Sequence, residues 1–349
     1  MDLMDLMNKA SRDNLSRHPE VSIVVPAYNE EGNLAALHSE IVKTLSVLNL
    51  SWELIICDDG STDKTWDETV RLNERDKHVR GVRLSRNFGH QYALYAGLAA
   101  ASGQAVISMD ADLQHPPELI PILVARWQQG HKIVFTVRLD SGDVPFLKRT
   151  TSRAFYKLFS CLSGVRLEEG MADFRLLDRQ VVTTLLQFRE GGLFLRGLLP
   201  WIGYPSCKVE YQAQKRFAGR TKYSLTKMLR FAWTGIVSFS IIPLRLGIGI
   251  GLVTSLLAFG GIVYAIYGRL ISGTAVPGWA SAVSIISFLF GVLFIVLGLM
   301  GEYIGRIFVE VRGRPRFVID ELIGIDLGLK ADLDSRPFTD VPVKHPPEI

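Results

Sequence analysis

Residues 105–116, AVISMDADLQHP, decide the fold. They begin with five mostly apolar residues typical of a short buried strand, and two carboxylates, Asp110 and Asp112, follow at once. In an extended chain, residues two apart point the same way, so both carboxylates can face one site. The stretch therefore predicts a strand that ends in a polar site.

Further apolar runs and helical patterns surround this stretch. The runs are residues 21–26 (VSIVVP), 53–57 (ELIIC), 79–84 (VRGVRL) and 133–137 (IVFTV), and the helical patterns cover residues 33–48, 63–76, 91–101 and 117–129. Apolar strands that alternate with helices predict an α/β fold whose parallel sheet is covered on both faces. In such a sheet, ligands bind beyond the carboxyl ends of the strands.

The later part of the chain has a different character. The chain has 349 residues, of which 48% are hydrophobic. Residues 246–267 and 270–301 contain no Asp, Glu, Lys or Arg, and Arg269 stands between the two runs. About 20 apolar residues span a bilayer as a helix. We therefore expect two transmembrane helices, at about 243–267 and 279–301. A buried helical hairpin is the alternative, and the length of the uncharged runs argues against it.

Basic residues flank this apolar region on both sides. They are Arg216, Arg220, Lys222, Lys227, Arg230 and Arg245 before it, and Arg306, Arg312, Arg314 and Arg316 after it. This positive-inside pattern predicts a multi-pass protein of the plasma (inner) membrane with both termini in the cytoplasm. The first 20 residues have no apolar core typical of a signal peptide, so the first domain is also expected in the cytoplasm.

The predicted organisation has five parts. They are an extension (1–20), a catalytic domain (21–222), an amphipathic helix at the bilayer interface (223–240), a two-helix hairpin (241–307) and a cytoplasmic tail (308–349), which is expected to be loose from about residue 320. Residues 153–163 are also amphipathic, and packing on the sheet or lying at the interface remain equally open. The net charge of +4 is too small to indicate a nucleic-acid partner. Three cysteines without CxxC spacing support neither a disulfide framework nor a zinc site.

Asp110 and Asp112 supply the hard oxygen ligands that Mg²⁺ or Mn²⁺ prefers. Such an ion neutralises a diphosphate as it leaves. A bare DxD is weak, because acidic turns after strands are common. Two companions strengthen it, residues 26–31 (PAYNEE) and 58–63 (DDGSTD), each at a predicted strand end. Each has a purely structural alternative, helix-dipole complementation for the first and a turn with a helix cap for the second. Three such clusters at successive strand ends favour a site.

The segments VSIVVPAYNEE, LIICDDGSTDKT, LSRNFGHQYALYAGL, MDADLQHPPE and ADFRLLDR resemble the family-2 inverting glycosyltransferases with the GT-A (Rossmann-like) fold. More narrowly, they resemble the polyprenyl-phosphate sugar transferases, a group that includes dolichol-phosphate mannose synthase and bactoprenol glucosyltransferase, and the latter is the nearer likeness. The resemblance continues through GLFLRGLLPWIG and GEYIGRIFVEVRGRPRF and covers about residues 21–318.

The resemblance implies a set of site residues. The residues expected to bind the nucleotide sugar are Pro26, Tyr28, Glu30, Asp58, Asp59, Asp110 and Ala111, and those expected to bind the metal are Asp110, Asp112 and Gln114. The residues expected to bind the donor and acceptor phosphates are Arg138, Arg149, Arg216 and Lys222. The expected catalytic residues are Asp112 and Asp173. Asp173 has an alternative role, which is to pair with or orient an arginine such as Arg175. His90 departs from the pattern, because bactoprenol enzymes carry lysine there.

The resemblance also implies the reaction, transfer of a hexose, glucose from UDP-glucose, to undecaprenyl phosphate at the cytoplasmic membrane face. Another sugar of the mannose, GlcNAc or aminoarabinose type stays open. A processive polysaccharide synthase is disfavoured, since the chain lacks a QxxRW motif and has few spans, and a non-enzymatic sensor or carrier subunit would need no DADLQ. Glycines in both predicted spans permit close helix approach and predict a homo-oligomer, which the resemblance implies is a tetramer.

Overall fold

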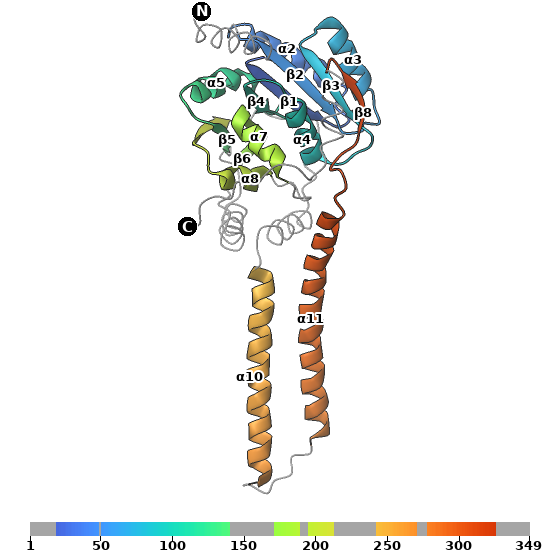
Figure 1. Ribbon diagram of the computed structural model, residues 1–349, viewed down its shortest axis with the longest axis vertical. Coiled ribbons are helices and arrows are strands. Elements are labelled where there is room, and N and C mark those ends of the chain that lie inside the picture. Colours follow the sequence, from blue (N-terminus) through green and yellow to red (C-terminus); the bar gives the residue numbers. More distant parts are fainter. Residues whose placement is uncertain are drawn as a thin grey trace, which may run out of the picture. The chain divides into compact units, whose positions relative to one another are not determined.

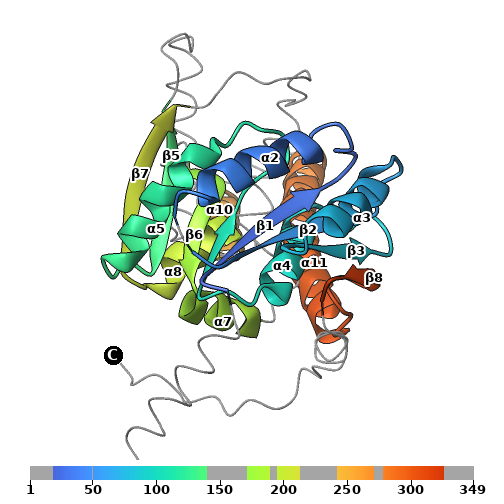
Figure 2. The same cartoon turned by 90° about the horizontal axis from the view of Figure 1, so that it is seen from above.

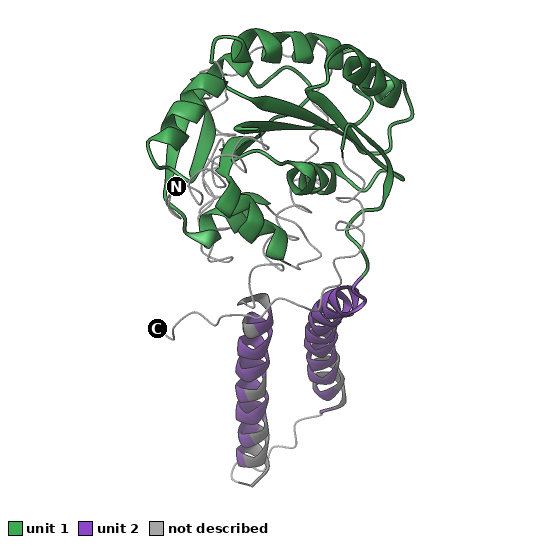
Figure 3. Cartoon of the chain, turned by 45° about the horizontal axis from the view of Figure 1, so that its top comes forward, with its two compact units in different colours: residues 1–156, 166–222, 314–349 green, residues 157–165, 223–313 purple. Residues whose placement is uncertain are grey.

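A computed structural model describes residues 19–48, 50–139, 171–188, 195–212, 242–270 and 278–325. The chain divides into two compact units, which are coloured separately in Figure 3. Unit 1 comprises Met1–Tyr156, Arg166–Lys222 and Arg314–Ile349, and unit 2 comprises Lys157–Val165 and Tyr223–Gly313. Each unit is described by itself.

Unit 1 is built on a twisted sheet whose described strands lie in the order β7-β5-β6-β4-β1-β2-β3-β8, with β7 and β8 at opposite edges (Figure 2). The strands are β1 (Val21–Ala27), β2 (Trp52–Asp58), β3 (Val79–Leu84), β4 (Ala105–Ser108), β5 (Ile133–Leu139), β6 (Met171–Asp178), β7 (Ser206–Gln212) and β8 (Ile319–Ile323). All five strands predicted from the sequence are present, each within two residues of its expected ends.

The sheet is mixed rather than wholly parallel. Strands β4, β1, β2 and β3 are parallel, as predicted. However, β6 inserts between β4 and β5 and pairs antiparallel with both, and β8 pairs antiparallel with β3. The pattern of apolar runs identified the strands but not their partners, because long-range pairing is not written in local periodicity. This correction matters for the site, since β6 begins at the edge where β4 ends.

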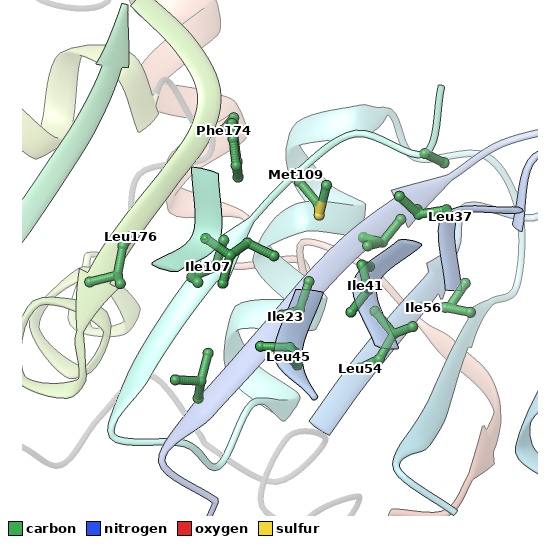
Figure 4. Close-up of a cluster of buried hydrophobic side chains, with 14 of the residues drawn as sticks. Ile23, Leu37, Ile41, Leu45, Leu54, Ile56, Ile107, Met109, Phe174 and Leu176 are labelled. Atoms are coloured by element: carbon green, nitrogen blue, oxygen red, sulfur yellow. The ribbon is translucent and has the colours of Figure 1, made fainter. Parts of the chain in front are cut away.

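Helices cover both faces of this sheet. They are α2 (Leu34–Leu45), α3 (Thr65–Arg75), α4 (His90–Ala100), α5 (Ile120–Gln128, after a short 3₁₀ turn at Pro117–Leu119), α7 (Arg179–Gln187) and α8 (Leu195–Ile202). Leu37 and Ile41 of α2 lie in one buried cluster with Ile23 and Ile107 of the sheet (Figure 4). Leu123 of α5 belongs to the same cluster. On the other face α4 packs so closely that a Cβ on Gly97 would lie 2.3 Å from Val24 Cγ1.

Unit 2 contains two long helices, α10 (Ile242–Leu270) and α11 (Trp279–Val311), which run antiparallel and side by side (Figure 1). Gly247 lies at their contact, where an added Cβ would be 3.7 Å from Val296 Cγ2. Within the described residues, one helical segment is long and apolar enough to cross a membrane, Phe288–Val311, with a mean hydropathy of 2.0. The apolar part of α10, Leu246–Gly261, is shorter, so the first predicted span stays a prediction.

Two expectations about the C-terminal part need adjustment. The second helix continues to Val311 instead of ending near residue 301, and Glu302 and Arg306, one turn apart, form an ion pair of 3.2 Å within it. The tail is not loose at residue 320, because Ile319–Ile323 forms β8. Arg149, Arg216, Lys222 and both amphipathic segments lie outside the described residues.

Candidate active site

The three acidic motifs meet at one edge of the sheet, because β1, β2 and β4 are parallel neighbours. Ala27 at the end of β1 pairs in register with Asp58 at the end of β2, and the Asp59 N–H donates to the Ala27 carbonyl at 2.9 Å. Met109, which leads into the DxD motif, donates its N–H to the Val24 carbonyl at 3.0 Å. The predicted convergence of these motifs is confirmed.

The loop that carries Asp110 is fixed by a histidine. The Asp110 N–H donates to His115 Nδ1 at 3.0 Å, so the ring proton lies on Nε2, which is 3.7 Å from Asp110 Oδ2. His115 is buried and stacks on Phe174 at 5.2 Å, and burial lowers its pKa. An immobilised ring therefore fixes the backbone of Asp110, and the buried Oδ1 of its carboxylate has no hydrogen-bond partner among the described residues.

Asp112 is held by its own loop. Its Oδ1 accepts the Gln114 N–H at 3.1 Å, and its Oδ2 accepts from the Gln114 side chain. Between them, Leu113 has a φ of +59°, a left-handed conformation that is uncommon for a residue with a side chain. Gln114 thus orients Asp112 in this structure, and its direct binding to a metal stays a prediction.

Glu30 from the β1 motif adds a third carboxylate close to these two. Burial raises the pKa of Glu30 most; the hydrogen bond from Asn33, at 2.5 Å, opposes this, and the negative charges of Asp112 and Asp110 raise it further. No group of three potential ligands stands preassembled within the described residues. Mg²⁺ and Mn²⁺ usually take one or two carboxylates together with substrate phosphates. The free oxygen of Asp110 beside Asp112 fits that mode.

Asp58 and Tyr28, which the sequence predicts to bind the nucleoside, lie at the ends of β2 and β1. Asp58 is fully buried, its Oδ1 accepts the Ser61 N–H at 3.1 Å, and its Oδ2 has no hydrogen-bond partner among the described residues. Burial raises the pKa of Asp58. Tyr28 follows β1 with 44% of its surface exposed, which leaves its ring open to stack on a base. Pro26 and Ala111, by contrast, are buried in the wall of the site.

Asp59 has a positioning role in the structure. Its two carboxylate oxygens accept the backbone N–H groups of Phe88, at 2.8 Å, and Gly89, at 2.9 Å. Gly89 has a φ of +108°, which favours glycine, and the next residue, His90, begins α4. Asp59 therefore fixes the turn that presents His90 to the site.

His90 lies between the carboxylate of Asp110, a predicted metal ligand, and a second, deeply buried one. Its Nε2 lies 3.6 Å from Asp110 Oδ1 and 3.7 Å from Asp173 Oδ2. Burial tends to lower the pKa of His90, but the bond to Asp173 and the charge of Asp110 outweigh this, and its pKa is raised. The two carboxylates therefore make protonation of His90 more favourable than that of a free imidazole.

Asp173 of β6 is surrounded by cations. Arg196 of α8 donates Nε to Oδ1 at 3.1 Å and Nη2 to Oδ2 at 2.9 Å, and Arg175 donates to Oδ1. Burial would raise the pKa of Asp173, yet Arg175, His90 and Arg196 hold it well below its usual range. A carboxylate so strongly stabilised as an anion is a poor proton acceptor. The alternative role, orientation of arginines, fits this geometry better than a general base.

Of the predicted phosphate-binding cations, Arg138 is described. It lies at the exposed end of β5, in register with Tyr211 of β7. Burial raises the pKa of Tyr211 to about 12, Arg138 opposes this, and Asp110 and Asp112 add to it. Because β4 and β5 both pair antiparallel with β6, the two strands end at the same edge of the sheet, and Arg138 lies at the edge that carries Asp110.

The sequence did not assign roles to His115, Arg196 or Arg83. His115 lies inside the DADLQHP motif, and its position next to two aspartates was a signal that could have identified it. Arg196 lies inside FLRGLLPWIG, where no such signal was available. Arg196 and Asp173 are brought together from separate elements, and no local spacing encodes that contact.

Comparisons with known proteins identify the family of this chain. The family model described as "Glycosyl transferase family 2" matches residues 22–195. An uncharacterized glycosyltransferase of Synechocystis sp. is 40% identical over 307 residues, which is 88% of this chain and 96% of that protein. A prophage bactoprenol glucosyl transferase homolog of Escherichia coli is 39% identical over 300 residues, 86% of this chain and 98% of that protein. Glucosyl-3-phosphoglycerate synthase of Mycobacterium tuberculosis is similar in structure, with a TM-score of 0.47 and 21% identity over 64% of this chain and 78% of that one. This chain belongs to the family-2 glycosyltransferases.

Proposed function

We propose that this glycosyltransferase moves glucose from UDP-glucose to a polyprenyl phosphate, such as undecaprenyl phosphate, at the cytoplasmic face of the membrane. Relatives named bactoprenol glucosyl transferase, in Shigella phage SfII and elsewhere, are 39% identical over nearly their whole length. The observation that carries the proposal is that His90 lies between Asp110, on the metal side, and the Asp173–Arg196 ion pair. The acidic groups suited to the metal-bound donor therefore lie next to the basic groups suited to an anionic acceptor.

The donor occupies the acidic side in this proposal. Asp110 and Asp112, with Gln114 behind them, would hold Mg²⁺ or Mn²⁺, and the bound ion would neutralise charge on the leaving diphosphate. Asp58 Oδ2 would accept an N–H of the base, and Tyr28 would stack on it. In this proposal Glu30 would accept a hydroxyl of the ribose.

The acceptor needs little help with proton removal. A phosphate monoester has a second pKa near 6, so at neutral pH its oxygen is already largely anionic. This oxygen attacks C1 of the sugar from the face opposite the diphosphate, the C1–O bond to the diphosphate breaks with its electron pair, and the configuration at C1 inverts. The chain's contribution is to bring two anions together, which is the work of Arg196 and Arg138, with Arg175 buried behind them. Asp173 holds two of these arginines in place, and Arg149, Arg216 and Lys222 are proposed as further cations.

The membrane setting follows from unit 2. The apolar segment Phe288–Val311 supports anchoring in a bilayer, and we propose α10 as a second span, which would leave both termini in the cytoplasm. Around Gly291, Gly298 and Gly301 of α11 an added Cβ would meet no atom within 4 Å. These open glycines suit a homo-oligomer, a tetramer in this proposal.

The test is a donor and acceptor panel with the purified full chain in mild detergent. Undecaprenyl phosphate is offered with UDP-glucose, UDP-GlcNAc or GDP-mannose and Mn²⁺, and products are identified by mass spectrometry. We expect a monoglucosylated lipid phosphate from UDP-glucose and none with undecaprenol, which lacks the phosphate. A long polymer would indicate a processive synthase instead. Nucleotide binding without any transfer would indicate a carrier or sensor.

A further inference from the structure

The strand that follows the second long helix is part of the catalytic sheet. After α11 the chain runs through residues 312–318 into β8, which lies beside β3 (Figure 2). The two strands pair antiparallel, with Glu321 opposite Arg83. The Ser85 N–H also donates to the Val318 carbonyl at 2.9 Å. Strand β8, which was not part of the predicted site, therefore borders β3. Strand β3 is in turn the neighbour of β2, which ends in Asp58.

Arg83 is shared among three carboxylates. Its Nε lies 3.8 Å from Asp58 Oδ2 and 3.9 Å from Asp320 Oδ2, and its Nη1 lies 3.8 Å from Glu321 Oε2. Its guanidinium also lies over the Trp66 ring, 5.8 Å from the centroid, and the Trp66 Nε1–H donates to Glu321 at 2.9 Å. None of the three carboxylates takes Arg83 at hydrogen-bond distance, so the two on β8 balance the pull of Asp58.

This balance leaves one atom of Asp58 available. The side chain is fully buried, and its Oδ2, the oxygen nearest Arg83, has no hydrogen-bond partner among the described residues. An arginine at 2.9 Å would occupy that oxygen. At 3.8 Å it supports the negative charge but leaves the oxygen free to accept an N–H donor from a ligand.

We propose that Glu321, with Asp320, is a positioning residue for the donor: it holds Arg83 back from Asp58, so that Asp58 Oδ2 can receive the ring N–H of a nucleoside diphosphate. The inference rests on the proposed function in taking the ligand of this edge to be a nucleoside diphosphate. Uracil and guanine both present ring N–H groups, so the geometry sets the class of ligand, and UDP and GDP form separate arms of the test.

The register of β8 is anchored by the residues before it. Arg316 donates to the Phe188 carbonyl just beyond α7, where a cation is favourable at a helix C-terminus, and lies over the Tyr95 ring at 4.6 Å. The Phe317 ring lies 6.4 Å from Tyr95, and the Tyr95 hydroxyl donates to the Leu186 carbonyl at 3.0 Å. These contacts fix the segment that leads into β8, so Glu321 meets Arg83 in one register.

The test uses Glu321→Gln in the full chain. Glutamine keeps the shape and an acceptor for Trp66 but loses the charge that holds Arg83. Arg83 then closes on Asp58, and we expect UDP, titrated calorimetrically with Mn²⁺, to bind roughly five-fold more weakly or worse, the scale of one lost hydrogen bond. KM for UDP-glucose should rise similarly, whereas kcat at saturating donor and KM for the lipid phosphate should change little. Asp320→Asn should act in the same direction with a smaller effect, because its contact with Arg83 is longer and more exposed.

A double-mutant cycle separates positioning from general damage. In an Arg83→Met background, Glu321→Gln should cause no further loss, because the residue that it releases is gone. Glu74→Gln, an exposed glutamate on neighbouring α3, is the matched control and should bind UDP as the wild type does. Normal UDP and GDP affinity in Glu321→Gln, or an undiminished loss in the Arg83→Met background, would overturn the inference. Normal UDP binding by the wild type without sugar transfer would instead refute the proposed function alone, and failure of the wild type to bind either nucleotide would refute both.

Discussion

Asp173 accepts two hydrogen bonds from Arg196, from Nε at 3.1 Å and from Nη2 at 2.9 Å, so the planar guanidinium and the carboxylate meet edge to edge. Arg175 shares the same carboxylate from within β6. Such two-point pairing fixes the plane of an arginine as well as its charge. The proposed acceptor side of the site is therefore organised by a carboxylate whose pKa is held well below its usual range.

The first prediction follows from the charge of Asp173. The pKa of Asp173 in the folded protein lies well below its usual range, so its stabilising contribution is complete above the ordinary pKa of an aspartate and is lost only as the pH falls through the lower folded value. Between pH 5 and 8 the rate should rise near pH 6 with the second ionisation of the acceptor phosphate, and it can change further with the protonation of His90, but not with Asp173. A pH–rate profile of kcat/KM for the lipid phosphate measures this.

Asp173→Asn tests the same point from the other side. If Asp173 positions arginines, the variant should raise KM for the lipid phosphate, and its rate should still increase near pH 6. If Asp173 removes a proton, kcat should collapse with KM unchanged, and raising the pH should recover activity. The second result would restore the general base.

The second prediction concerns the metal. Asp110→Asn and Asp112→Asn should each lower kcat by roughly 100-fold or more, the scale for loss of one group that stabilises developing charge. EDTA should have the same effect on the wild type, and added Mn²⁺ or Mg²⁺ should reverse it. Glu118→Gln, an exposed carboxylate on the turn before α5, serves as the control. Undiminished turnover in EDTA would remove the metal from the proposal.

The local parts of this fold could be predicted from the sequence, and the long-range parts could not. The runs that became β1 and β2 are almost wholly apolar, and polar motifs at their ends located the site. Strand β8 has the sequence IDELI. Charged residues on an edge strand protect the strand from unwanted pairing, but they also make its sequence resemble that of a loop. The contacts of Asp173 with Arg196 and of Arg83 with Glu321 depend on which strands become neighbours. Local spacing does not carry that information.

The third prediction concerns Gly60, in the turn after Asp58. Its φ is +65°, and an added Cβ would lie 2.4 Å from the backbone carbon of Arg86. Gly60→Ala should therefore destabilise the catalytic unit by about 2 kcal/mol or more. Gly32→Ala, where a Cβ would meet nothing within 4 Å, should be nearly neutral. Thermal unfolding of both variants in the same detergent gives the comparison, and equal melting temperatures would contradict the clash.

The fourth prediction concerns Asp178 at the start of α7. Its carboxylate caps the helix by accepting the Gln180 N–H at 3.0 Å, and it accepts from Trp127 Nε1 at 2.8 Å and Lys132 Nζ at 3.1 Å. Burial would raise the pKa of Asp178, but these bonds outweigh it and lower the pKa. Asp178→Ala should cost about 2–3 kcal/mol, from the lost cap and the unpaired indole N–H.

The pH dependence of Asp178 has a definite sign. Because its folded pKa is depressed, its contribution is present above the usual aspartate pKa and disappears as the pH falls further. The stability difference between wild type and Asp178→Ala should therefore be constant from pH 5 to 8 and shrink below pH 4. A difference that grows on acidification would show that the contacts do not depend on the ionised carboxylate.

The last prediction concerns Arg196, whose pairing with Asp173 leaves 40% of its side chain exposed at the edge of the site. An arginine fixed by a buried carboxylate can bind a phosphate without the entropy cost of ordering a free side chain. Arg196→Ala should raise KM for the lipid phosphate by roughly ten-fold or more, since charged hydrogen bonds contribute about 1.5–3 kcal/mol. Arg196→Lys should recover part of this loss, because it keeps the charge but not the two-point geometry. UDP binding should change little in both variants. Arg216 and Lys222, if they bind the acceptor too, should show the same split when replaced by alanine. Loss of UDP affinity with a normal lipid-phosphate KM would instead assign Arg196 to the donor diphosphate and leave the acceptor phosphate to the other cations.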